Sequence, residues 1–278
     1  MSRTVRNILI VGAPRSGTSL TAGAFARHGY FIGRIEEEHM REGDAGNPFG
    51  YFEADDVIDA NVELFEAAGF PHHNTWLFDE IGEDAIRRID ELEPRGEHRK
   101  LMALYDTHAP WVWKDPRLCF TLGYWWKIVD PARTGVVLVR RDFDQIYTSF
   151  RRRGWCREGE AVRAALEERI ERHLQAAQET IQRLDIPHIA VEYAECTEDP
   201  EAVSRHLTEF TGTTFDPANL NVRPELNHST GRGRLAARLR MSLDAGWLRH
   251  AKFLKPLVPR RLLNAILPEK RFEKNQPV

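Results

Sequence analysis

The residues best suited to chemistry stand near the amino end of the chain, in a short glycine-containing segment. Residues 12–19 read Gly-Ala-Pro-Arg-Ser-Gly-Thr-Ser, after an apolar run at 8–11 and before a segment typical of a helix. A loop between a strand and a helix presents successive backbone N–H groups, and the helix adds the positive end of its dipole. The pattern therefore predicts a site for a phosphate or sulfate ester.

The side chains of this loop differ from those of a kinase-type P-loop. That P-loop reads G-x-x-x-x-G-K-[ST], with the lysine on the terminal phosphates and the hydroxyl on magnesium. Thr18 occupies the lysine position, and the cation stands upstream at Arg15. Because a planar guanidinium suits bidentate contact with phosphate oxygens, the loop favours a 5′-phosphate over a metal-bound triphosphate.

The loop resembles the 5′-phosphosulfate loop of the sulfotransferases that use 3′-phosphoadenosine 5′-phosphosulfate (PAPS), which commonly reads P-[KR]-[ST]-G-[ST]-[ST]. The matching residues here are 14–19. The resemblance implies that PAPS is the co-substrate and that the acceptor is a hydroxyl group, on a glycan, a glycolipid or a small natural product. It also implies which residues hold the 5′-phosphosulfate, namely Arg15, Ser16, Gly17, Thr18 and Ser19.

Residues 134–150 supply a second motif, a β-branched apolar run followed by a charged turn and a helix. This arrangement is similar to the 3′-phosphate element of the same family. The match implies that Arg141 and Ser149 hold the 3′-phosphate, with Arg140 as the substitute for Arg141. A late basic segment that closes the nucleotide site in many sulfotransferases has a counterpart at Arg232, for which a solvated basic loop is the alternative.

A third motif, Trp-Val-Trp-Lys-Asp-Pro-Arg at 111–117, reads as a short strand that ends at a proline. Its Lys-Asp-Pro unit is similar to that of tyrosylprotein and related sulfotransferases. The match implies that Lys114 stabilises the charge that develops as the sulfur–oxygen bond breaks. Arg117 either contacts a ligand phosphate or pairs with Asp115.

A fourth motif, Asn-Pro-Phe-Gly-Tyr-Phe-Glu at 47–53, resembles one found in many bacterial sulfotransferase-like proteins. It places Glu53 in the first turn of a helix, where a carboxylate can take the proton of an attacking hydroxyl. Glu53 is therefore the first candidate for the base. Glu36, at a spacing from Arg15 close to that in tyrosylprotein sulfotransferases, and His108, in Thr-His-Ala-Pro, remain alternatives. Both also fit a solvated surface position.

The composition favours a compact soluble enzyme of 278 residues. A net charge of −3 and a pI of about 6.4 give no support to a nucleic-acid partner. The sequence contains no apolar run that could span a bilayer and does not open with a signal-peptide pattern, so we expect a cytoplasmic protein. The cysteines, Cys119, Cys156 and Cys196, and the scattered histidines lack ligand spacing, which predicts neither a disulfide framework nor a metal site.

Strand and helix candidates alternate along the chain, which predicts a P-loop-like α/β/α fold of three layers with a mostly parallel central sheet. The strand candidates are 6–12, 30–32, 111–114, 135–140 and 187–193. The helix candidates are 17–28, 54–68, 83–93, 97–106, 118–129, 143–152, 158–184 and 199–211.

The resemblance extends over roughly residues 5–215, so we expect a PAPS-binding catalytic domain at 1–234. Residues 235–278 read as a helical C-terminal extension, broken by prolines. This extension could pack on the domain, pair two subunits as a homodimer or lie on an acidic membrane surface, and packing is the expectation. Residues 69–82 mix aromatic, polar and turn residues as an acceptor-side loop would.

Two other classes of protein use the same kind of loop. A P-loop kinase of a small metabolite would need a lysine where Thr18 stands and would prefer magnesium–ATP. A non-catalytic nucleotide-binding protein on a sulfotransferase fold would bind the nucleotide without turnover. The carboxylate of Glu53 argues against the second class.

Overall fold

The computed structural model describes residues 5–33, 50–70 and 81–220, and the structural statements below refer to these residues. Four parallel strands form one sheet in the order β2-β1-β3-β4. Their bounds are β1 (Asn7–Val11), β2 (Val112–Lys114), β3 (Thr134–Arg140) and β4 (His188–Glu192). The helices are α1 (Thr18–Arg27), α2 (Asp55–Ala67), α3 (Glu83–Glu91), α4 (Gly96–Asp106), α5 (Leu118–Trp126), α6 (Phe143–Arg152), α7 (Glu160–Arg183), α8 (Tyr193–Glu198), α9 (Pro200–Thr211) and the short 3-10 helix η2 (Pro217–Leu220).

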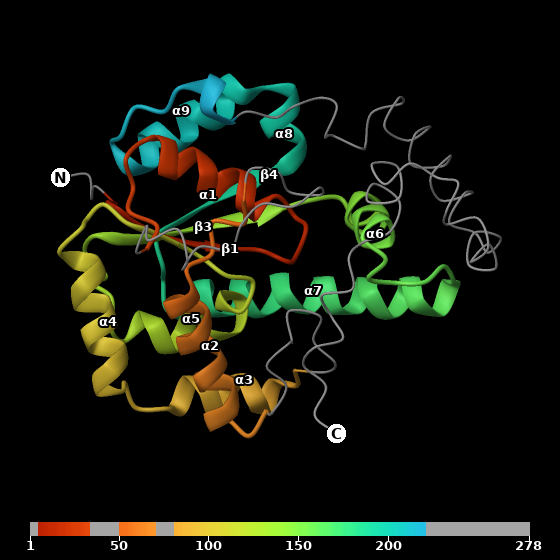
Figure 1. Cartoon of the computed structure of the whole chain (residues 1–278), viewed down its shortest axis with the longest axis horizontal. Helices are drawn as coiled ribbons and strands as arrows, with labels where there is room; N and C mark the ends of the chain where they lie inside the picture. The colour runs from red at the N-terminus through yellow and green to blue at the C-terminus, as the bar shows by residue number, and fades with distance from the viewer. Residues whose placement is uncertain (1–4, 34–49, 71–80, 221–278) are drawn as a thin grey trace, which may run out of the picture.

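The sheet is covered on both faces, as Figure 1 shows. Ile8 and Ile10 of β1 pack with Phe25 of α1, and α9 and η2 complete that layer. Leu9 and Val11 of the same strand point the other way and pack with residues of α2, α3, α4, α5 and α7. Since successive side chains of a strand face opposite sides, one apolar run supplies two cores. The three-layer fold with a parallel sheet is therefore confirmed.

The described elements follow the predicted ones closely, and the main differences concern two strands and Glu53, which stands before α2 and not in its first turn. The expected strand at 30–32 is reduced to a single parallel bridge between Phe31 and Trp111. The chain after β4 turns at once into α8, where the prediction extended the strand to residue 193. The boundary at 234/235 and the expected C-terminal extension lie outside the described residues.

The carboxyl ends of all four parallel strands lie on the same edge of the sheet. The strand that follows β1 in the chain, β2, pairs with one edge of β1, and the next strand, β3, pairs with its other edge. In open parallel sheets, ligands bind at such a reversal, outside the carboxyl ends of the strands. The segments that begin at this edge are the loop after Val11, Asp115, Arg141 and Tyr193.

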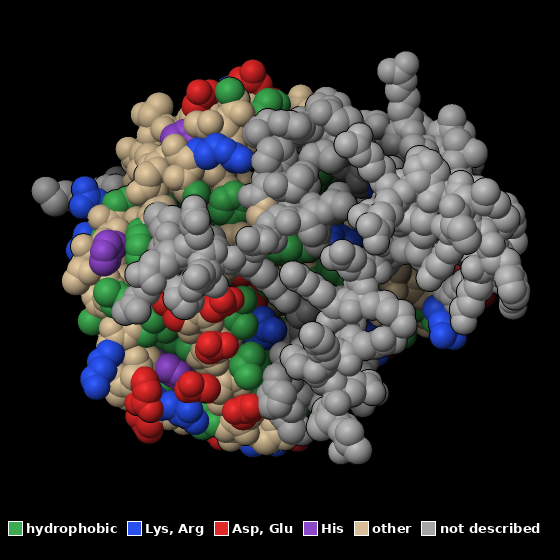
Figure 2. All heavy atoms as spheres, in the orientation of Figure 1, with side chains coloured by type: hydrophobic (Ala, Val, Ile, Leu, Met, Phe, Trp, Pro, Cys, Tyr) green, Lys and Arg blue, Asp and Glu red, His purple; other side chains and the backbone are tan. Residues whose placement is uncertain are grey.

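On the face shown in Figure 2, acidic side chains gather over α2, α3 and α4. Helix α2 alone carries Asp55, Asp56, Asp59, Glu63 and Glu66. Burial and then the neighbouring carboxylates raise the pKa of Asp59. Within the described ranges, no helix combines the length and the apolar character needed to cross a bilayer.

Candidate active site

The loop between β1 and α1 is held in a strained conformation. The N–H of Ser16 donates to the carbonyl of Ala13 at 3.1 Å, which closes a turn with Pro14 in its second position. Arg15 follows with a φ of 69°, as the third position of a type II turn requires. A non-glycine residue there costs on the order of 1 kcal/mol, and such strain is concentrated at functional sites.

Gly17 ends the loop and caps the amino end of α1, where no side chain of the described residues caps the first turn. Its φ is 110°, and a Cβ at this position would lie 2.5 Å from Cδ2 of Tyr193. The ring of Tyr193, at the end of β4, therefore packs directly on this glycine. Uncapped N–H groups at a helix start are donors for an anion.

Ser16 lies in the same loop, and its side chain is buried. Its Oγ has no hydrogen-bond partner within the described part of the chain. Buried hydroxyls are normally paired, so an orphan in this loop is the kind of group that a bound oxyanion satisfies. Thr18, also buried, and the half-buried Ser19 begin α1 beside it.

The structure brings three predicted residues together. Nε of Arg15 donates to Oγ of Ser149 at 2.9 Å, and Nη1 of Arg141 donates to the backbone carbonyl of Arg15 at 3.0 Å. An apolar contact joins the same two segments, because Ala13 of the loop packs against Ile146 of α6. The two motifs predicted for the two ends of the nucleotide therefore lie in direct contact.

Arg141 is held from two further sides. Its Nε donates to Oε1 of Gln145 at 3.0 Å, and its guanidinium lies 3.9 Å from the centre of the Tyr193 ring. Burial lowers the pKa of the Arg141 guanidinium from its ordinary value, although arginine stays charged in proteins. Arg140, the predicted substitute, instead approaches Glu192 at 3.8 Å on the half-exposed surface.

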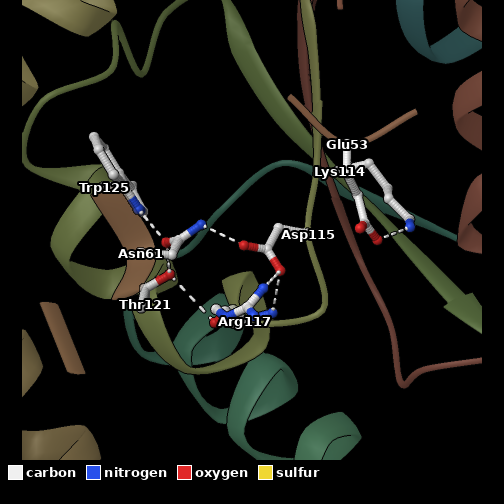
Figure 3. A network of polar contacts seen from close by, with 7 residues as sticks. All are labelled: Glu53, Asn61, Lys114, Asp115, Arg117, Thr121 and Trp125. Atoms are coloured by element: carbon white, nitrogen blue, oxygen red, sulfur yellow. Dashed lines mark hydrogen bonds and ion pairs between the residues drawn. The ribbon is translucent and has the colours of Figure 1, made fainter. Parts of the chain in front are cut away.

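Lys114 and Glu53 form a buried ion pair, in which Nζ of Lys114 donates to Oε1 of Glu53 (Figure 3). The two residues are 5% and 4% exposed. Lys114 is the last residue of β2 and stands in register with Ile10 of β1. The pair therefore lies at the carboxyl edge of the sheet, next to the strand that leads into the loop.

The backbone before Glu53 is also strained. Phe52 adopts a φ of 53°, which is unusual for a bulky residue. Its ring packs on Gly23 of α1, where a Cβ would lie 2.9 Å from Cε2 of Phe52. Since α1 also carries the loop, this contact positions Glu53 relative to the anion site. Asn47, Pro48 and Phe49 of the same motif lie outside the described residues.

A hydrogen-bonded network lies beside the ion pair (Figure 3). Oδ1 of Asp115 accepts from the backbone N–H of Arg117 at 3.0 Å and from its Nη1 at 2.9 Å. Of the two roles considered for Arg117, the structure shows the pairing with Asp115. Oδ2 of Asp115 accepts from Nδ2 of Asn61 at 3.0 Å. Oδ1 of Asn61 accepts in turn from Thr121 at 2.7 Å and from Trp125 at 2.8 Å.

Aromatic rings separate the cations of the site. Nζ of Lys114 lies 6.0 Å from the centre of the Tyr51 ring, and the guanidinium of Arg153 lies 5.9 Å from the same ring. Arg153 also lies 5.2 Å from the centre of Trp155, and Arg15 lies 5.8 Å from it. Sequence reasoning missed this alternation. Arg153 belongs to a run of three arginines, whose members cannot be told apart by type.

The two alternative bases differ in what the structure shows. Glu36 lies outside the described residues. His108 is exposed, its Nδ1 lies 3.0 Å from the carbonyl oxygen of Leu104, and its ring stacks on Phe31 with 4.4 Å between centres. It precedes β2 and so lies toward the amino edge of the sheet, away from the loop. The geometry favours Glu53 over His108.

Two of the three cysteines, Cys119 and Cys196, are buried core residues. Burial raises the pKa of the Cys119 thiol to about 12, and likewise that of Cys196. Within the described ranges, no three His, Cys, Asp or Glu side chains are placed to hold a metal ion. Tyr193, to which sequence reasoning gave no role, stands directly after β4, but this position alone does not identify a site residue. Arg232 lies outside the described residues.

Comparisons with known proteins bear on this site. The family model described as "Sulfotransferase family" matches residues 7–217. Among solved structures, the chain is similar to the sulfotransferase domain from the Synechococcus PCC 7002 olefin synthase, with 15% identity, a TM-score of 0.45 and 84% of each chain covered. The search of curated proteins found no significant match. Because the family model matches well over half of the residues of this chain, the chain belongs to the sulfotransferase family.

Proposed function

We propose that this protein transfers a sulfuryl group from PAPS to an acceptor hydroxyl, on a glycan, a glycolipid or a small natural product. The observation that carries the proposal is the contact of Arg15 with Ser149 and Arg141 beside the buried Lys114–Glu53 pair. One edge of the sheet thus carries both kinds of group that the reaction needs. Its cations suit the two phosphates of the donor, and its carboxylate suits the proton of the acceptor hydroxyl. Membership of the family agrees with this arrangement.

The described residues fit the donor. The orphan hydroxyl of Ser16 and the amino end of α1 suit the 5′-phosphosulfate, together with the guanidinium of Arg15. Arg141 and Ser149 suit the 3′-phosphate, and we assign Arg232 to the same group. The positive charges of Arg15, Lys114 and Arg141 can neutralise the charge of the nucleotide, so the proposed reaction requires no metal.

Glu53 and Lys114 act on the two bonds of the proposed reaction. Bound PAPS supplies the electrophilic sulfuryl group: the acceptor oxygen forms a bond to sulfur while the bond from sulfur to the phosphate oxygen breaks. Glu53 takes the proton of the acceptor hydroxyl. An ammonium has three N–H donors, so Lys114 can keep Glu53 as a partner and also donate to the oxygen on which charge develops.

Calorimetric titration tests the donor assignment. The protein is titrated with 3′-phosphoadenosine 5′-phosphate (PAP), adenosine 5′-phosphate and ATP, each with and without magnesium. Tight binding that requires the 3′-phosphate and ignores magnesium is the expected result. Preference for magnesium–ATP would overturn the donor assignment and favour a kinase.

A screen of acceptors with labelled PAPS then tests turnover. We expect label to appear in a hydroxyl-bearing glycan, glycolipid or small molecule, and to require Glu53. Tight PAP binding without any labelled product or cleavage of PAPS would instead indicate a non-catalytic nucleotide-binding protein.

A further inference from the structure

The two proposed catalytic side chains come from different elements, and a second contact ties these elements together. Glu53 stands just before α2, and Lys114 ends β2. Asn61 of α2 donates from Nδ2 to Oδ2 of Asp115 at 3.0 Å, and Asp115 follows Lys114 directly. The segment of Glu53 and α2 is thus joined to the end of β2 twice, once by the ion pair and once by the Asn61–Asp115 bond (Figure 3).

The tie is itself fixed on both sides. Oδ1 of Asp115 accepts two hydrogen bonds from Arg117, and Oδ1 of Asn61 accepts from Thr121 and Trp125. Asn61, Asp115 and Thr121 are fully buried. Satisfied polar groups in a buried site specify one arrangement, because hydrogen bonds are directional. The apolar contacts of α2 with the core are not directional and leave its rotation less defined.

We propose that Asn61 is a positioning residue for the sulfuryl transfer, and this inference rests on the function proposed above. By tying α2 to the end of β2, its amide sets the separation between the Glu53 carboxylate and the Lys114 ammonium. The reaction needs such a tie, because Lys114 must direct an N–H toward the donor while Glu53 faces the acceptor. The ion pair joins two long side chains that both act in the reaction, whereas the buried Asn61–Asp115 bond takes no part in the chemistry and joins the two elements directly.

The test compares Asn61→Ala with Thr121→Val. The second variant removes one of two hydrogen bonds to the same Asn61 oxygen, in the same buried cluster. It leaves the bond from Trp125 to that oxygen and the bond from Asn61 to Asp115 in place. We measure melting temperature, PAP affinity by calorimetry, and cleavage of PAPS with water as the acceptor. Both variants should melt at lower temperature. Asn61→Ala should lower the cleavage rate by about tenfold or more with PAP affinity within about threefold, and Thr121→Val should change neither by more than about threefold.

Two further measurements separate positioning from general weakening. In a Glu53→Gln background, Asn61→Ala should lower the rate by less than about threefold, since residues that act through one group are not additive. Crystal structures should show a longer distance from Glu53 to Lys114 in Asn61→Ala and an unchanged distance in Thr121→Val. If Asn61→Ala does not fold, Asn61→Ser takes its place, because the serine side chain is too short for its hydroxyl to reach Asp115.

Equal rate losses in Asn61→Ala and Thr121→Val would overturn the proposal, as would an unchanged Glu53–Lys114 distance in Asn61→Ala. Failure of the proposed function has a different signature. In that case the wild-type protein neither binds PAP nor cleaves PAPS, and the crystal structures alone decide whether Asn61 positions the pair.

Discussion

Arg15 donates a hydrogen bond to the hydroxyl of Ser149 at 2.9 Å, although the two residues are 134 positions apart in the chain. The contact joins the loop after β1 to α6, the two elements assigned to opposite ends of the nucleotide. A site whose parts already touch loses less conformational freedom when a ligand binds. Because residues in contact couple, the effects of substitutions at the two ends are not expected to be additive.

Arg141→Ala should weaken the binding of PAP far more than that of adenosine 5′-phosphate. A hydrogen bond to a charged group contributes about 1.5–3 kcal/mol, so we expect a loss of about tenfold to a hundredfold for PAP alone. Calorimetry measures both affinities. Arg140→Ala is the matched control. Arg140 pairs with the half-exposed Glu192, and its removal should leave both affinities unchanged. Equal losses for the two nucleotides in Arg141→Ala would contradict the 3′-phosphate role.

Glu53→Gln should slow turnover by about a hundredfold or more, because removal of a general base typically costs that much. The amide keeps the shape of the side chain, so PAP affinity should change little. Rate measurements with labelled PAPS, paired with PAP titration, check both expectations. Glu63→Gln, a half-exposed carboxylate on the same segment of chain, serves as the control and should turn over normally. Normal turnover of Glu53→Gln would direct attention to Glu36.

The sequence predicted the elements of the fold well, because apolar periodicity and the loop motifs are local features. Lys114 and Glu53 were each singled out by a motif, but their pairing depends on the strand order β2-β1-β3-β4 and joins residues 61 positions apart. The roles of Tyr193 and Asn61 depend on tertiary contacts in the same way. A tyrosine after a strand and an asparagine in a helix are common, and only the fold brings them against Gly17 and Asp115.

The buried His173 of α7 should make the fold sensitive to acid. Burial against Phe120 lowers its pKa to about 4 from the usual 6.5. Between these values the unfolded chain binds a proton that the folded chain does not, so stability is full above pH 6.5 and falls toward pH 4. Each pH unit in this window costs up to about 1.4 kcal/mol. Urea unfolding at several pH values should show a flatter acid limb for His173→Leu, and parallel curves for the two proteins would contradict this cause.

Thiol labelling of the native protein should find one reactive cysteine. Cys119 and Cys196 are buried, and burial raises the pKa of both thiols to about 12, so neither supplies thiolate at pH 8. Cys156 is partly exposed and should react, more slowly than a free thiol because burial also raises its pKa. Cys156→Ser should therefore show no labelling until urea is added. Rapid native labelling of Cys119 would mean that α5, the helix that carries it, opens in the folded protein.

Lys114→Met should destabilise the fold as well as abolish turnover. Removal of one partner of a buried ion pair weakens the compensation of the other charge, which costs up to about 3–5 kcal/mol. The double variant Lys114→Met/Glu53→Gln should recover much of this loss, because neither charge of the pair remains, while turnover stays absent. Lowering the pH should also reduce the difference in free energy of unfolding between Lys114→Met and the wild type, since a buried carboxyl that has lost this cation can then become neutral. Urea unfolding of the three proteins measures these differences, and a stable Lys114→Met would show that Glu53 reaches water or another cation when Lys114 is absent.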